Sequence, residues 1–401
     1  MAVGQQTFST INATTDFVQK SFASMITRLM PNGAAPLFGL TSMLKTETAV
    51  QVEHGFFTKT MIFPQVVMNA SALSTDTTLN VTDSSNMVPG MLVRNQTTKE
   101  VVLILTVPTG TSVTCRRAVG TVAAAAMSSA QKLYQVGTAF EEGSARPSAV
   151  QIVSVRVTNY TQIFRNSWAL TDTARATQVI AGDTNISESR GECAGFHAAD
   201  MEKAILFGQK YTGTLNNKPI RTMDGIVNQV TQNAAANVNT AGGTTNYTQL
   251  ETYLDVCFDT TTDPKVANER VLFCGGAAKR VLNNIGRLNG TYQLVEGQTS
   301  YGLQFSSFKT SRGTFRMIEH PLFNSNADWA KMAIAVDLST FNLAYLGDRK
   351  TMSEEYGIQG NKVEAGGVDA VGGSLTTEVT CLVKNPAANA IIYDLTAAAA
   401  G

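Results

Sequence analysis

Three side chains on one expected helix are of types that could bind a metal ion. Cys193 and His197 are four residues apart, and Asp200 follows three residues later. These spacings would put a thiolate, an imidazole and a carboxylate on one helix face, and all three are ligands of zinc-like metals. The other histidines, His54 and His320, form no second cluster that would supply further ligands. Buried helix packing explains Cys193 and His197 better, so we expect neither a metal nor a cofactor.

A second candidate for chemistry is a pair of glycines, Gly275-Gly276, between an expected strand and an expected helix. Backbone amides at such a junction can hold an anion. The stretch lacks the G-x-x-x-x-G-K-[ST] pattern of a phosphate loop and the G-x-G-x-x-G pattern of a dinucleotide site. The pair is therefore better interpreted as a tight turn.

Adjacent carboxylates occur at Glu141-Glu142, and paired carboxylates can perform acid–base catalysis. Adjacent side chains on a strand point apart, so a solvated turn or a turn that bridges subunits is the favoured interpretation. The sequence contains no Gly-x-Ser-x-Gly motif, and we expect no enzyme. Its basic doublets have no interleaved aromatic residues, so they predict at most weak, non-specific affinity for nucleic acid: Arg116-Arg117, Lys279-Arg280 and Arg349-Lys350.

Composition favours a protein of two or three lobes without a dedicated nucleic-acid surface. The 401 residues exceed one typical domain, and 31 basic residues balance 31 acidic ones. Only 15% of residues are charged, which suits a protein buried in an assembly but also an ordinary neutral soluble protein. The five scattered cysteines predict reduced, buried thiols.

The sequence predicts no association with a membrane. No window approaches ~20 consecutive apolar residues, which a spanning helix needs. Residues 1–6 lack the basic start and apolar run of a signal peptide, so we expect synthesis and folding in a cytoplasm.

The elements that would position these residues begin with a long helix at 186–211. Its roughly 26 residues would span about 39 Å, and they present a narrow apolar face of Ala194, Ala198, Met201, Ile205 and Gly208. A β-rich run at 150–164 precedes it, and a short helix led by Asp16 lies near the start. Short strands within 69–137 predict a small antiparallel sandwich or barrel: 78–81, 91–94, 100–107, 112–117 and 132–136.

The second half of the chain is predicted to alternate helices and strands. We expect helices at 247–258 and 277–285, a loop at 357–373, and strands at the following positions: 270–274, 314–319, 331–336, 342–346 and, last, 376–383.

Several short strings, in this order, resemble the major capsid proteins of tailed bacteriophages with the Hong Kong 97-type fold. They are Pro36-Leu37-Phe38, the run from Gly137 to Gly143 (GTAFEEG), the run from Asn159 to Phe164 (NYTQIF), and Thr377 to Thr380 (TEVT). The resemblance covers most of the chain and implies an α+β fold with a small all-β insertion. It implies these divisions: an N-terminal arm at 1–48, extended-loop legs at 49–68 and 138–165, the inserted β domain at 69–137, a peripheral domain with a spine helix at 166–220 and 343–401, and an axial domain at 221–342.

The function that the resemblance implies is self-assembly into pentamers and hexamers of an icosahedral or elongated head shell. This shell would enclose double-stranded DNA, without sequence specificity, in a virion assembled in the bacterial host cytoplasm. The implied partners are further copies of the chain, a portal protein, a separate scaffold protein and a decoration protein. The implied contacts between subunits involve Phe38, Phe56, Phe57, Phe63, Glu141, Glu142 and Arg146. The alternative is a secreted adhesin or tail structural protein with a carbohydrate-binding β module.

Overall fold

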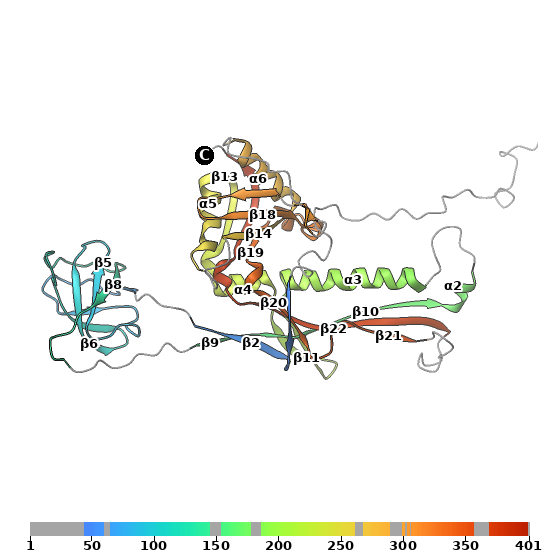
Figure 1. Cartoon of the computed structure of the whole chain (residues 1–401), viewed down its shortest axis with the longest axis horizontal. Helices are drawn as coiled ribbons and strands as arrows, with labels where there is room; N and C mark the ends of the chain where they lie inside the picture. Colours follow the sequence, from blue (N-terminus) through green and yellow to red (C-terminus); the bar gives the residue numbers. More distant parts are fainter. Residues whose placement is uncertain are drawn as a thin grey trace, which may run out of the picture. The chain divides into compact units, whose positions relative to one another are not determined.

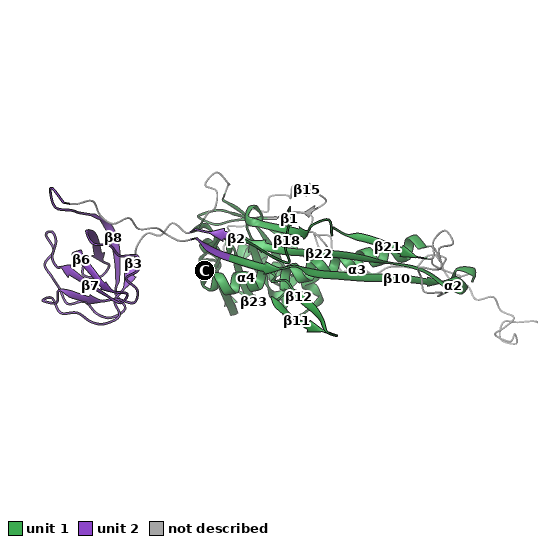
Figure 2. Ribbon diagram, turned by 90° about the horizontal axis from the view of Figure 1, so that it is seen from below, with its two compact units in different colours: residues 1–56, 157–401 green, residues 57–156 purple. Residues whose placement is uncertain are grey.

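The chain divides into two compact units, which Figure 2 colours separately. The computed structural model describes residues 44–59, 65–144, 154–177, 186–260, 268–288, 299–300, 303–304, 306–356 and 369–399. Unit 1 comprises Met1–Phe56 and Val157–Gly401, and unit 2 comprises Phe57–Arg156. Both contain sheets and unit 1 also contains helices, so the fold is α+β as expected.

The first sheet of unit 1 is built around the long strand β22 (Ala370–Val383). It pairs antiparallel with β10 (Gln162–Thr171), β20 (Phe341–Leu346) and β21 (Met352–Tyr356). The strand β1 (Lys45–Ala49) adds to β20 in parallel. Every residue of β22 except Ser374 is buried, because neighbouring strands flank it and other elements cover it.

The long helix α3 (Ile186–Phe207) packs along β10 and β22, as Figure 1 shows. Cys193 on the helix packs against Trp168 of β10 and against Val371 and Leu375 of β22. A short helix, α2 (Asp172–Ala176), follows β10, and its N-cap residue Thr171 accepts a hydrogen bond from the amide of Ala174.

The second sheet of unit 1 has six strands and is covered on both faces. Its order is β13 (Val238–Thr245), β23 (Ala390–Ala398), β19 (Ala333–Val336), β14 (Glu269–Cys274), β18 (Thr314–Glu319) and β17 (Ser306–Lys309). In β19, Ala333 and Ala335 face the helices α5 (Tyr247–Asp255) and α6 (Gly276–Leu288), and Ile334 and Val336 face the other core. Period-two alternation therefore places both sets of side chains in apolar surroundings.

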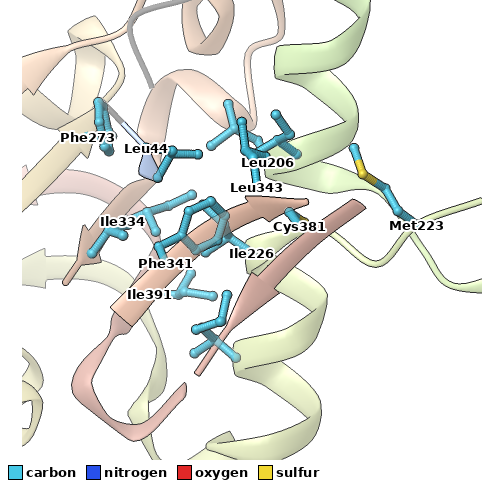
Figure 3. Close-up of a cluster of buried hydrophobic side chains, with 14 of the residues drawn as sticks. Leu44, Leu206, Met223, Ile226, Phe273, Ile334, Phe341, Leu343, Cys381 and Ile391 are labelled. Atoms are coloured by element: carbon cyan, nitrogen blue, oxygen red, sulfur yellow. The ribbon is translucent and has the colours of Figure 1, made fainter. Parts of the chain in front are cut away.

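One apolar cluster joins the two sheets, the end of α3 and the helix α4 (Ile226–Asn233). Figure 3 shows its centre, where side chains from these elements point toward one another: Leu44, Leu206, Met223, Ile226, Phe273, Ile334, Phe341, Leu343, Cys381 and Ile391. Burial of such side chains stabilises a fold by about 25 cal/mol per Å² of apolar surface. This shared core makes both sheets parts of one unit.

Smaller elements complete unit 1. Three two-stranded sheets are formed by β2 (Glu53–Thr58) with β9 (Val155–Tyr160), β11 (Tyr211–Leu215) with β12 (Lys218–Thr222), and β15 (Thr299–Ser300) with β16 (Leu303–Gln304). The division between the units falls within the first of these pairs. Short 3-10 turns are η1 (Ala235–Asn237), η2 (Val256–Phe258), η3 (Pro321–Ser325), η4 (Trp329–Lys331), η5 (Leu338–Thr340) and η7 (Pro386–Ala388).

Unit 2 is a small antiparallel barrel. Its strand order is β3 (Gln65–Val67), β8 (Lys132–Thr138), β5 (Met91–Asn95), β6 (Val101–Thr109), β7 (Ser112–Arg116) and β4 (Thr78–Asn80). An antiparallel bridge between Met68 and Val81 connects the two ends of this order, so the sheet closes on itself. The expected strands and the barrel are confirmed. The sheet also includes β3, whose residues fall in the range expected for an extended-loop leg.

Some expected elements are wrong. The long helix ends at Phe207 and not at 211, because Tyr211 already begins β11. Gly208 follows the helix in close contact with backbone, since an added side chain there would meet the oxygens of Ala204 and Met223. On that helix Ala194 is exposed, and the buried face instead contains Cys193 and His197.

Two further expectations fail near the chain's end. Gly372 and Gly373, expected in a loop, lie in β22 between β10 and β21. Residues 376–383 are not the last strand, because β23 follows and pairs with β13 and β19 of the second sheet. The strand β23, near the end of the chain, thus belongs to the same sheet as the strands of residues 221–342. The Asp16 helix lies outside the described residues.

Candidate functional site

The candidate metal ligands of α3 are engaged in hydrogen bonds and packing. Nδ1 of His197 lies 2.7 Å from Oδ1 of Asn166, and its Nε2 lies 2.7 Å from Oγ1 of Thr377. Asp200 accepts a hydrogen bond from Asn166, and Cys193 is buried in the apolar contact described above. Burial lowers the pKa of His197, although the charge of Asp200 opposes this. In the described part of the chain, no group of three or more His, Cys, Asp or Glu side chains could hold a metal.

The glycine pair joins β14 to α6, and Gly276 is the first residue of the helix. A side chain on Gly275 would lie 2.4 Å from the carbonyl oxygen of Ala330, so the close approach of two backbones requires glycine here. The amide of Gly276 donates to Oδ1 of Asn324, and Asn324 in turn donates to Glu319. A carboxylate of the chain thus lies beside the helix N-terminus, where an anion would have to bind.

Each basic doublet uses one member inside the fold. Arg117 forms two hydrogen bonds of 2.7 Å with the buried carboxylate of Glu100. Lys279 lies 3.3 Å from Glu319, and Arg349 lies 3.1 Å from Glu378. One cation of each doublet is thus paired with a carboxylate of the chain, whereas Arg116, Arg280 and Lys350 are exposed.

The candidate contact residues are divided between described and undescribed parts of the chain. Phe56 is half-buried on β2, whereas its neighbour Phe57 is 71% exposed. Glu141 and Glu142 are exposed in a turn after β8. Phe38, Phe63 and Arg146 lie outside the described residues.

The ribbon of β2 and β9 carries large apolar side chains that the described chain leaves exposed. Phe57 on β2 and Val155 on β9 are 71% and 62% exposed, and Val50, just before β2, is 90% exposed. Two strands alone cannot bury a face, and an isolated hairpin is marginally stable in water. These side chains are therefore exposed on the part of the ribbon that the structure describes.

A second ribbon, of β11 and β12, was not predicted from the sequence. Its two-residue turn, Asn216-Asn217, has positive φ angles of 50° and 59°, as tight hairpin turns require. Tyr211, Leu215 and Ile220 on its strands are 57%, 59% and 37% exposed. Two adjacent asparagines between short β-forming runs were the signal that could have revealed it.

Helices of the described residues include none long and apolar enough to cross a membrane.

Comparison with known families decides what kind of protein carries these ribbons. The sequence pattern of the SU10 major capsid protein family matches residues 7–396. The chain belongs to the SU10 major capsid protein family.

One relative agrees with this assignment, and solved structures that resemble the chain are reported beside it. The chain is similar to the major capsid protein of Pseudomonas phage PaMx41, with 40% identity over 406 residues, covering 98% of this chain and 97% of that one. A structure from Mycobacterium phage Bobi is 8% identical, with a TM-score of 0.46 over 94% of this chain and 96% of that one. A structure from Gordonia phage Cozz is 12% identical, with a TM-score of 0.45 over 96% and 93%.

Membership of the SU10 major capsid protein family confirms the function class expected from the sequence. The chain is a structural protein of a phage particle, and its family is not a family of enzymes. The parts that the Hong Kong 97-type resemblance implied within the described residues are present. They are the paired ribbon β2–β9, the long helix α3, a domain of sheet and helices, and the β insertion.

Proposed function

We propose that this SU10-family protein assembles into pentamers and hexamers, which form an icosahedral or elongated head shell around double-stranded DNA. Family membership supports a role in the capsid. The observation that carries the proposal is the apolar surface of the two ribbons, β2–β9 and β11–β12.

Neighbouring copies would cover these ribbons. Covering Phe57, Val155, Tyr211 and Leu215 would remove apolar surface from water at each contact, at about 25 cal/mol per Å². Each contact is modest, but a copy that meets several neighbours adds them, so the assembly is much more stable than any single contact. This explains why a chain can leave large side chains exposed as a monomer.

The parts of the chain would have separate roles in the shell. Of the range 1–48, the residues before β1 would be an arm, since β1 itself joins the first sheet. The ribbon β2–β9 would be the extended loop, with Phe38, Phe56, Phe57, Phe63 and Arg146 at subunit contacts. The sheet with α5 and α6 would surround the capsomer axes, and α3 with β10 and β22 would form the periphery. β23 would belong to the axial part, since it pairs with β13 and β19.

Further partners would be a portal protein, a separate scaffold protein and a decoration protein, with assembly in the bacterial host cytoplasm. The balance of 31 basic and 31 acidic residues suits a wall that encloses DNA without binding particular sequences.

Electron microscopy of the chain, expressed alone and with its genomic neighbours, tests the proposal. We expect capsomers or closed shells. Phe57→Ser should reduce the yield of shells, whereas Leu73→Ser, at a side chain that is 66% exposed, should leave it unchanged. Both substitutions should leave the circular dichroism spectrum unaltered. A small closed oligomer, or tubes in place of shells, would refute the proposal.

A further inference from the structure

The strands of the unit 2 barrel carry charges of one sign, and its acidic residues, among them the exposed Asp83, lie outside the strands. None of the six described strands contains an aspartate or a glutamate. Their only basic residues, Arg94, Arg116 and Lys132, are all exposed. The acidic Glu100, just before β6, is buried and bonded to Arg117.

Strand register places Arg94 and Lys132 on one part of the barrel's exterior, whereas Arg116 on β7 lies three strands from β8 in the closed sheet. Arg94 lies opposite Tyr134 on β8 and opposite Val101 on β6, and Arg116 lies opposite Leu103. Directly opposed residues in antiparallel strands share a face. Lys132 shares the face of Tyr134, two residues later on the same strand. We call this surface the basic face: Leu92, Arg94, Leu103, Lys132, Tyr134 and Val136.

The centre of the basic face is apolar and open. Val136 is 54% exposed at a β-bulge between β5 and β8, and Leu105, further along β6, is 46% exposed. Beside them is a surface hollow of about 270 Å³, lined by Arg94, Asn95, Gln96, Lys99, Tyr134 and Val136. Two cations and an aromatic ring thus surround a space without any acidic lining residue. This combination suits a carboxylate carried on a partly apolar segment.

The same unit carries a segment of that chemistry at its other end. Phe140, Glu141 and Glu142 follow β8, and all three are exposed, Phe140 by 50%. No described residue forms an ion pair with either glutamate. Lys132 is the first residue of β8, and the two glutamates follow the end of this strand. The seven residues of β8 therefore separate the charge of Lys132 from the glutamates by roughly 20 Å. Because screening in physiological salt acts over about 8 Å, the two ends cannot neutralise each other within one copy.

We propose that the Phe140-Glu141-Glu142 segment of one copy binds the basic face of a second copy. The contact is heterologous, since two different surfaces meet, and heterologous contacts close into rings when the rotation between copies allows it. Arg94 and Lys132 receive the carboxylates, and Phe140 covers Val136. The inference rests on the proposed function, in which copies meet in a shell, and assigns the insertion a part in joining them.

Cross-linking in assembled particles of the full chain tests this contact. The double variant Lys132→Cys with Glu142→Cys, treated with a short bismaleimide, should give a ladder of dimers, trimers and larger species. Each single variant should give none, because one cysteine has no partner within reach and the five native thiols are buried. A product that stops at the dimer would indicate a contact of identical surfaces and would overturn the proposal.

Charge exchange provides a second, independent readout. Glu141→Lys with Glu142→Lys should reduce particle yield at physiological salt about tenfold, which corresponds to 1.4 kcal/mol. Arg94→Glu with Lys132→Glu should do the same, and the four substitutions together should restore the yield.

The outcomes separate this proposal from the proposed function. Particles that form normally but give no ladder and no charge rescue would overturn the contact and leave the shell function intact; the basic face would then belong to a different acidic partner. If neither the parent chain nor any of these variants forms particles, the shell function is refuted. If the soluble oligomers of the double-cysteine variant also give no cross-links, the contact is refuted as well.

Discussion

Nε2 of His320 lies 3.0 Å from Oε1 of Glu202, and both side chains are fully buried. Glu202 belongs to α3, and His320 follows β18 of the second sheet, so the pair connects the long helix to that sheet. His320 also packs against Phe273 and Phe323. A polar pair in such surroundings specifies how the helix and the sheet meet.

Glu202→Ala should lower the stability of unit 1 by about 3 kcal/mol, because it leaves a buried partner without its hydrogen bond. Glu202→Gln should cost less, since its carbonyl oxygen can still face His320. Thermal unfolding followed by calorimetry measures both. Glu354→Ala, at an exposed glutamate of β21, is the control, and an equal effect of the two alanine variants would contradict the prediction.

Acid should selectively weaken the barrel of unit 2. Burial pushes the pKa of Glu100 upward, but hydrogen bonds from Arg117 and from the amides of Ala118 and Ala125 hold it below the usual 4.5. A depressed pKa in the folded state means that the stabilisation is present above pH 4.5 and is lost as pH falls through the folded-state value. Hydrogen exchange of barrel amides, measured between pH 7 and pH 3, should show this loss.

Arg117→Met should remove this acid-sensitive stabilisation, and it should destabilise the barrel at pH 7 by about 3 kcal/mol. Arg116→Met is a matched control, since Arg116 is exposed and adjacent. If both variants behaved alike, the ion pair would not be the source of the pH dependence.

Gly275→Ala should destabilise unit 1 by about 3 kcal/mol, because the added carbon would lie 2.4 Å and 2.5 Å from backbone atoms of Ala330. Gly195→Ala on α3 meets nothing within 4 Å and should be neutral or stabilise the helix by up to about 1 kcal/mol. Urea denaturation of the two variants measures the contrast. A tolerated Gly275→Ala would show that the two backbones can separate.

The five thiols should not react in the native protein. All are buried, and burial raises the pKa of Cys257 and Cys274 to about 12 and that of Cys115 to about 11. Only the thiolate reacts with alkylating reagents, so labelling at pH 8 should require unfolding. Mass spectrometry with and without urea counts the labels. Fast labelling of the folded chain would indicate that its cores open.

The hairpin of β11 and β12 should matter for assembly and not for folding. Leu215→Ser should leave the melting temperature within about 1 °C of the parent, because an exposed substitution changes stability little. The yield of assembled particles should fall. Sedimentation separates shells from subunits, and unchanged yields would exclude this hairpin from subunit contacts.

Local pattern was enough to predict much of the fold. The barrel strands alternate buried and exposed side chains between turn residues, and α6 buries Ala278, Val281, Leu282 and Ile285 at helical spacing. These signals lie within a few residues of one another, so tertiary context cannot change them easily.

The remaining features depend on partners distant in sequence. A glutamate on a helix is expected in water, and the sequence does not show that Glu202 is buried beside His320, 118 residues away. Gly372 and Gly373 indicate a loop until β10 and β21 flank them. The expected contact residues were chosen by resemblance. Of those in the described chain, Phe57, Glu141 and Glu142 are exposed, and Phe56 is half-buried. The sequence alone does not show which side chains of a two-stranded ribbon remain exposed.

The chain enters unit 2 through β2 and leaves it through β9, and these two strands pair with each other. Both ends of the barrel are therefore attached at neighbouring points of the same ribbon. A gene segment that encodes the barrel could be deleted, or exchanged for another domain with adjacent termini, without altering the register of the remaining sheets. The same geometry makes this position suitable for the insertion of foreign domains, and it offers evolution a cassette that can change while the pairing of the remaining sheets stays the same.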